Sequence, residues 1–126
     1  LDVIFTLEKT KRTPSVELSE KMLVVKGECY PENIAEFSEP IMENVQAVLD
    51  KAQVFDVIFE LIYFNSSSAM FLFDLFNMLD DAAGNGCEIA VKWRYATDDD
   101  SMEEAGADFE DAFEHASYEL EPRDEI

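Results

Sequence analysis

The hydroxyls of Ser66, Ser67 and Ser68 are the side chains of this sequence best placed to do chemistry. Residues 57–64 before them form a short apolar run rich in β-branched and aromatic residues, which predicts a buried strand. Asn65 and the serines belong to the residue types that cap helix N-termini. Helical spacing of apolar residues follows and predicts a helix, with Leu72, Leu75, Phe76, Leu79 and Ala83 on one side.

A junction of this kind supports two interpretations. In one, Asn65 and the serines only cap the helix. In the other, a serine is phosphorylated, since the free N–H groups and the dipole of a helix N-terminus favour an anion. A phosphate adds about −1.5 to −2 charges, which would change what the surrounding surface can bind.

The solvent side of the same helix predicts a surface for a partner protein. Asp74 and Asn77 lie opposite the apolar side, Met70 falls among the polar residues, and Phe73 and Met78 flank them. Methionine suits adaptable contacts, and grouped exposed apolar residues often mark binding surfaces. These five residues are expected either to bind a partner or to be buried under another element.

Motifs for catalysis or metal binding are weak, so we expect no enzyme activity, metal or cofactor. The serines lack a GxSxG motif, and His115 is the only histidine, which disfavours a third interpretation, a hydrolase that uses Ser66. No HExxH motif, Cys/His cluster or phosphate-binding glycine loop occurs. Residues 98–100 are three aspartates that could attract a cation, but helix capping is favoured because the rest of a calcium loop is missing.

Composition restricts the class of partner. The 126 residues carry a formal charge of −20, which argues against binding to nucleic acid or to an anionic membrane. Neutral or basic protein surfaces are the expected partners, and the alternative is that the acidic residues only confer solubility. Cys29 and Cys87 are expected to be buried free thiols, and without a signal peptide or membrane-spanning run the chain is expected in the cytoplasm.

The order of the predicted elements indicates an α/β fold in a single domain, residues 1–126. Residues 13–18 and 22–27 alternate and predict an antiparallel hairpin, while Val3, Phe5 and Leu7 give a weak edge-strand signal. The first helix is expected to start near Glu39, because Pro40 is tolerated in a first turn but not inside a helix.

Strand 57–64, its helix and a strand over 87–95 predict a parallel βαβ unit. A third helix is expected after the aspartates, with one apolar side: Met102, Ala105, Phe109, Ala112 and Phe113. Tyr118 and Leu120 indicate a last strand. The fold class is therefore one mixed sheet packed with about three helices.

Several motifs together resemble the SiaC-type bacterial regulatory phosphoproteins. They occur in the family's order and with similar spacing over residues 10–121: Thr13-Pro14, residues 27–33 (GECYPEN), residues 63–68 (YFNSSS), residues 92–95 (KWRY) and residues 106–109 (GADF). The ordered set, rather than any single motif, carries the resemblance. The resemblance implies a STAS-like fold related to anti-sigma-factor antagonists.

The resemblance also implies a signalling switch that works by partner switching. A cognate Ser/Thr kinase phosphorylates the family's Tyr-Leu-Asn-Thr-Ser-Ser segment, and a PP2C-type phosphatase removes the phosphate. The unmodified form activates a diguanylate cyclase, which promotes cyclic-di-GMP signalling and biofilm formation. The family's phosphorylated threonine falls on Ser66, with Ser67 as the alternative, and Asn65, Ser67 and Ser68 as neighbours.

A second class of function stays open at this point. The chain could be a small acidic domain that binds a ligand or metal, with the serines holding a phosphate-bearing molecule at the helix N-terminus. Calorimetry with nucleotides and divalent ions separates the two, because only this alternative predicts tight binding by the protein alone.

Overall fold

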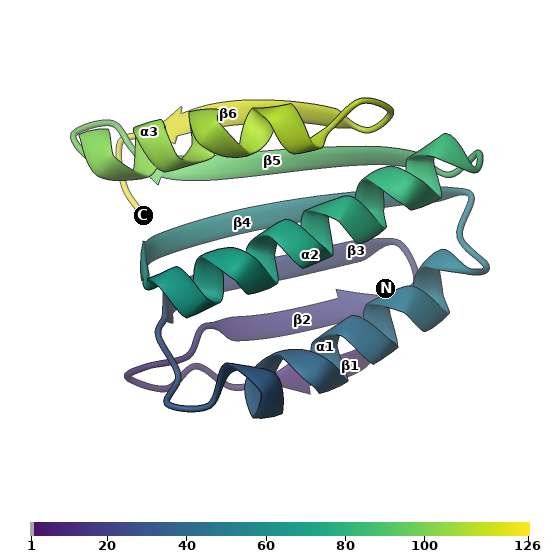
Figure 1. Cartoon of the computed structure of the whole chain (residues 1–126), viewed down its shortest axis with the longest axis horizontal. Coiled ribbons are helices and arrows are strands. Elements are labelled where there is room, and N and C mark those ends of the chain that lie inside the picture. Colours follow the sequence, from purple (N-terminus) through teal and green to yellow (C-terminus); the bar gives the residue numbers. More distant parts are fainter. Residues whose placement is uncertain (1) are drawn as a thin grey trace.

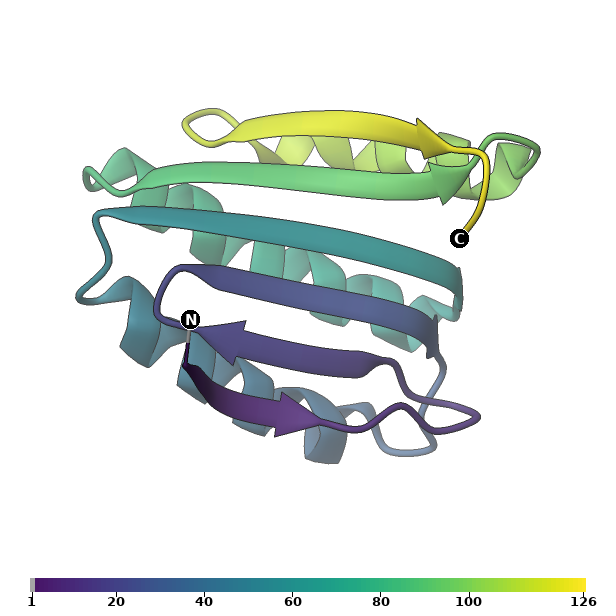
Figure 2. The same cartoon turned by 180° about the vertical axis from the view of Figure 1, so that it is seen from behind.

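Helices cover one face of a six-stranded sheet and leave the other face open (Figures 1 and 2). The computed structural model describes residues 2–126, so Leu1 of the predicted domain lies outside the described residues. The strands are β1 (Val3–Leu7), β2 (Ser15–Ser19), β3 (Met22–Cys29), β4 (Val54–Phe64), β5 (Glu88–Ala96) and β6 (Ser117–Arg123). The α-helices are α1 (Ile34–Leu49), α2 (Ser66–Gly84) and α3 (Asp100–Phe109), and a short 3₁₀ helix, η1 (Glu110–Ala112), follows α3.

The strands lie in the sheet in the order in which they occur in the chain. β1, β2 and β3 form an antiparallel meander, and β3, β4, β5 and β6 are parallel. Each parallel pair is joined through a helix, and right-handed crossovers that all step in one direction place every helix on the same face. The predicted mixed α/β sheet, with its hairpin and its parallel βαβ unit, is confirmed.

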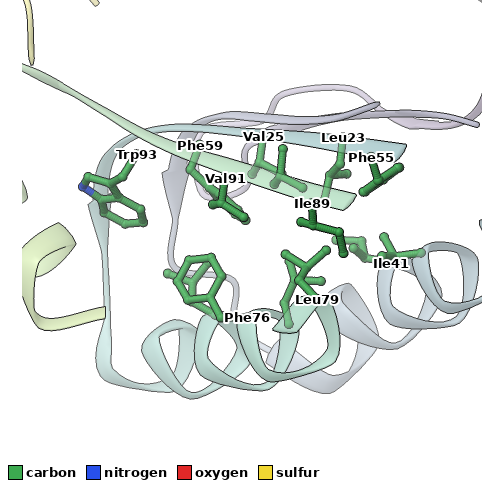
Figure 3. Close-up of a cluster of buried hydrophobic side chains, with 14 of the residues drawn as sticks. Leu23, Val25, Ile41, Phe55, Phe59, Phe76, Leu79, Ile89, Val91 and Trp93 are labelled. Carbon is green, nitrogen blue, oxygen red and sulfur yellow. The ribbon is translucent and has the colours of Figure 1, made fainter. Parts of the chain in front are cut away.

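The core lies between the sheet and the helices. Alternate residues of the central strands point toward α2, and among them Phe55, Phe59 and Trp93 are fully buried. Phe76 of α2 packs on this surface, with its ring centroid 5.1 Å from that of Phe59 and 6.4 Å from that of Trp93 (Figure 3). Leu79 extends the same contact toward Ile89 and Ile41 (Figure 3). The buried strand predicted for residues 57–64 is therefore the centre of the core, and it starts earlier, at Val54.

The first helix does not start near Glu39, as predicted, but at Ile34. The Asn33 side chain accepts a hydrogen bond from the Glu36 N–H at 3.1 Å and caps the helix, which leaves Pro40 inside it. A proline there costs a backbone hydrogen bond. Burial of an apolar side of the helix, which includes Ile41 and Val45, outweighs that cost.

The third helix is shorter than its apolar pattern predicted. Asp99 caps it, with a side-chain oxygen 3.0 Å from the Met102 nitrogen, but α3 ends at Phe109 and Phe113 lies beyond η1. Gly106 allows the helix to approach the sheet closely, because a Cβ atom at this position would lie 2.4 Å from the Trp93 ring. The Trp93 indole N–H in turn donates to the Met102 carbonyl at 2.9 Å.

None of the helices in residues 2–126 combines the length and the apolar character needed to cross a membrane.

Candidate functional site

The predicted junction between strand and helix is present at the carboxyl end of β4. Asn65 is the N-cap of α2, and its side-chain oxygen accepts a hydrogen bond from the Ser68 N–H at 3.0 Å. Ser66 and Ser67 occupy the first two helical positions and are exposed to solvent. Because Asn65 does the capping, both hydroxyls are available to another molecule.

Ser68 differs from the two serines before it. Its side chain is fully buried, and its hydroxyl has no hydrogen-bond partner within residues 2–126. The Cys29 thiol at the end of β3 is its neighbour. Burial raises the pKa of the Cys29 thiol. Ser68 therefore belongs to the support beneath the junction, and only Ser66 and Ser67 face solvent.

The junction is held from both sides. The Asn65 N–H donates to the Cys29 carbonyl at 3.3 Å, which ties the end of β4 to the end of β3. Phe64, the residue before the cap, packs into the core, with its ring 6.1 Å from Trp93 and 5.9 Å from Phe109. These contacts fix the position of Ser66 and Ser67 in the folded chain.

A group of basic and aromatic residues borders the junction, and its basic member, Arg12, was not singled out in the sequence. The Arg12 guanidinium lies over the Tyr30 ring, 5.9 Å from its centroid, and forms an ion pair with Glu32 at 3.1 Å. The Tyr30 ring contacts the Tyr63 ring edge-on at 5.6 Å. The sequence feature that could have pointed to this group is the cluster of three basic residues within residues 9–12, because the rest of the chain has few.

The five residues predicted to bind a partner lie on α2 but face different neighbours. Met70 is 65% exposed on the outer side of the helix. Phe73 leans toward α3, where its ring contacts Phe109 at 5.2 Å. Asp74, Asn77 and the half-buried Met78 line a groove of about 720 Å³ between α1 and α2.

The helical layer is acidic. α1, α2, α3 and η1 each contain Asp or Glu residues, and none of them contains Lys or Arg. The first turn of α2 carries no acidic residue, so a phosphate there would not meet a carboxylate of its own turn. Apart from that turn, a molecule that approaches the outer side of α2 meets negative charge and the exposed apolar groups of Met70 and Phe73.

The structure does not support the hydrolase interpretation, in which Ser66 is the nucleophile. His115 lies beside Gly84 at the far end of α2, about 27 Å along the helix axis from Ser66 at the usual rise per residue. Among residues 2–126, no three His, Cys, Asp or Glu side chains gather closely enough to hold a metal ion. In the 98–100 segment, Asp99 is occupied as the cap of α3.

Comparison with known families decides the assignment. The family of SiaC regulatory phosphoproteins matches residues 7–123. The chain belongs to this family. A curated relative, an uncharacterised protein of Pseudomonas aeruginosa (strain UCBPP-PA14), is 25% identical over 103 residues, which cover 79% of this chain and 82% of that protein.

Two solved structures of the family have the same fold. Apo-SiaC from Pseudomonas aeruginosa has a TM-score of 0.85 at 22% identity, over 96% of this chain and 99% of that one. SiaC in the crystal structure of the diguanylate cyclase SiaD with its activator SiaC, also from Pseudomonas aeruginosa, has a TM-score of 0.89 at 21% identity, over 94% and 99% of the two chains.

Proposed function

We propose that this member of the SiaC family is a non-enzymatic switch that is reversibly phosphorylated on Ser66. The cognate Ser/Thr kinase transfers the γ-phosphoryl group of ATP to the Ser66 hydroxyl oxygen. ADP leaves, and a base of the kinase takes the hydroxyl proton. A PP2C-type phosphatase hydrolyses the ester again. The proposed location of this exchange is the cytoplasm, where ATP is available.

The observation that carries the proposal is the exposure of two unused hydroxyls on a fixed helix N-terminus. Ser66 and Ser67 face solvent, and Asn65 already provides the cap. A kinase can therefore reach either hydroxyl without unfolding the helix. Ser66 is preferred because the phosphorylated residue of the resembled family falls on it, and Ser67 is the alternative.

The proposed output partner is a diguanylate cyclase, so that the chain controls cyclic-di-GMP signalling and biofilm formation. Support comes from the family and from the Pseudomonas aeruginosa relative that was crystallised with the cyclase SiaD as its activator. The proposed docking surface is the outer side of α2, with Met70, Phe73, Asp74, Asn77 and Met78.

Phosphorylation is proposed to release this partner through a short-range effect. The helical layer has no cation, so long-range attraction already favours a basic partner, and a phosphate would not reverse that attraction. Within a closed interface, however, the phosphate must be stripped of water, which costs several kcal/mol. The partner is therefore lost because the interface cannot close over the phosphate without this cost.

Phosphosite mapping tests the proposal directly. The protein is purified from its native cells with phosphatases inhibited, and peptides that span residues 65–73 are examined by mass spectrometry. We expect phosphate on Ser66. Phosphate on Ser67 would keep the mechanism and move its site by one residue, whereas unmodified peptides under all growth conditions would refute the switch and favour the ligand-binding alternative.

A further inference from the structure

The loop between β1 and β2 brings positive charge to the end of the sheet that carries Ser66. Both views place this loop at the same end of the molecule as the connection from β4 to α2 (Figures 1 and 2). Lys9, Lys11 and Arg12 lie in it, whereas the helices contain no cation. A phosphate on Ser66 can therefore find an intramolecular counter-charge only outside the helical layer.

A chain of contacts links Arg12 to the junction. The Tyr30 N–H donates to the Arg12 carbonyl at 2.7 Å, and Tyr30 directly follows β3. A second backbone hydrogen bond, from the Asn65 N–H to the Cys29 carbonyl at 3.3 Å, connects β3 to the junction. The backbones of Arg12 and Asn65 are therefore two hydrogen-bonded neighbours apart, which is about 10 Å at the usual spacing between strands. An arginine and a phosphoserine side chain that extend toward each other span this distance.

The present partner of Arg12 is easily given up. Its ion pair with Glu32 is exposed, with side-chain exposures of 53% for Arg12 and 82% for Glu32. Exposed pairs of this kind contribute little to stability, because water competes for both charges. A phosphate offers three acceptor oxygens and close to two charges, and it binds a guanidinium through two parallel hydrogen bonds.

We propose that Arg12 receives the phosphate of phosphorylated Ser66 and releases Glu32 as it does so. This inference rests on the proposed function, since it describes what the modified residue contacts. The exchange ties the β1–β2 loop to the N-terminus of α2, and it leaves Glu32 as a free carboxylate just before α1. Phosphorylation then changes the shape and the charge of this end of the molecule without unfolding an element.

The second pKa of the phosphate on Ser66 is a measure of its contact with Arg12. The full chain is produced with phosphoserine encoded at position 66, and the phosphorus chemical shift is followed against pH. An adjacent cation lowers the phosphate's second pKa from its usual value near 6, by roughly half a pH unit or more at an exposed site. We therefore expect Arg12→Gln to raise this pKa by that amount.

Matched variants separate a specific contact from general charge. Lys11→Gln removes the same charge from the same loop and is expected to shift the phosphate's pKa much less. Glu32→Gln removes the competitor for Arg12, so it is expected to lower this pKa, and to lower it less when Arg12→Gln is also present.

Equal shifts from Arg12→Gln and Lys11→Gln would overturn the proposal, and so would no shift from either variant. Because the phosphoserine is encoded, the titration does not depend on a kinase. Absence of Ser66 phosphorylation in cells would refute the proposed function, whereas the titration would still show whether Arg12 binds a phosphate at this position.

Discussion

The two faces of the sheet are built from the same strands and have opposite chemistry. On the face beneath the helices, alternate residues such as Phe59 and Trp93 are fully buried and form an aromatic cluster with Phe76. On the open face, their neighbours carry ion pairs. Lys26 pairs with Glu60 at 3.1 Å, and one carboxylate on β6 receives three cations.

That carboxylate belongs to Glu121, which lies 2.9 Å from Arg94, 2.9 Å from Arg123 and 3.5 Å from Lys92. The open face thus holds cations, while the helical layer has none. Under the proposed function, stability and recognition are divided between the two layers. The covered face provides the packing energy, and the acidic outer side of the helices is the proposed surface for a partner.

The largest expected effect comes from the covered face. Phe76 is fully buried and contacts five aromatic rings, those of Phe59, Trp93, Phe109, Phe113 and Tyr118. Phe76→Ala leaves a cavity among them and should lower the free energy of unfolding by about 3–5 kcal/mol. Urea unfolding followed by the fluorescence of the single tryptophan measures it.

Met70→Ala is the matched control for this prediction. It lies on the same helix, but its side chain is 65% exposed, so it should change the free energy of unfolding by no more than about 0.5 kcal/mol. Equal losses from the two variants would contradict the division between a packed face and a recognition surface.

The next effect comes from a carboxylate that connects the helical layer to the segment just before β6. The Asp80 carboxylate of α2 accepts hydrogen bonds from the backbone N–H groups of Glu114, His115 and Ala116, at 3.1, 2.8 and 2.9 Å. Burial raises the pKa of Asp80, but the three donors outweigh it, so the pKa is lowered. Asp80→Asn should reduce the free energy of unfolding by about 1–3 kcal/mol at neutral pH.

The pH dependence of the stability loss in Asp80→Asn tests whether the ionised carboxylate is its cause. Since the pKa of Asp80 is lower in the folded protein, its contribution is present above the unfolded value of about 3.9 and is lost as the pH falls through the folded value. The gap between parent and Asp80→Asn should therefore narrow below pH 4. A gap of constant size down to low pH would show that the ionised form is not what matters.

Asp80 also shows where prediction from sequence ends. The strands, the hairpin, the βαβ unit and the Asn65 cap follow from patterns within a few residues, and all are confirmed. Asp80 bonds to groups 34 to 36 residues away, which no local pattern contains. The start of α1 was wrong for a related reason, because tertiary burial outweighed the local preference against Pro40.

The candidate site also combines features that local sequence predicts with features that depend on distant contacts. The position of Ser66 and Ser67 at a capped helix N-terminus was predictable from residue types alone. The burial of Ser68 and the approach of Arg12 to Tyr30 depend on how β3 and the β1–β2 loop pack against β4, which the sequence does not state. Phosphorylation, the partner surface and the relation to STAS domains stay predictions.

A smaller effect is expected from the open face. The pKa of Glu121 is raised by burial, but Arg94, Lys92 and Arg123 outweigh this and lower it, so its stabilisation is lost as the pH falls through the folded value. Glu121→Gln leaves three cations facing one another. The melting temperature should fall by less than for Asp80→Asn.

Salt tests the origin of this fall. The decrease in melting temperature caused by Glu121→Gln should become smaller in 1 M salt, where the Debye length is about 3 Å. The decrease caused by Phe76→Ala should persist. A salt-independent deficit for Glu121→Gln would mean that packing, rather than charge, holds the open face.

The smallest effect on stability is expected at the proposed phosphorylation site. Ser66→Asp places a negative charge at the first position of α2, where the helix dipole stabilises it by roughly 0.3–1 kcal/mol. The melting temperature should stay close to that of the parent or rise slightly. Asn65→Ala is the contrasting variant, since loss of the cap should cost about 1 kcal/mol.

The value of this comparison is that it separates two ways in which a phosphate can act. If the charge works by changing which partner binds, Ser66→Asp keeps the fold and loses affinity for the proposed cyclase partner. If Ser66→Asp instead unfolds readily, the phosphate acts by melting the N-terminus of α2. Partner release would then follow from disorder of the docking surface, and the sorting of charge between the two layers would no longer be needed to explain it.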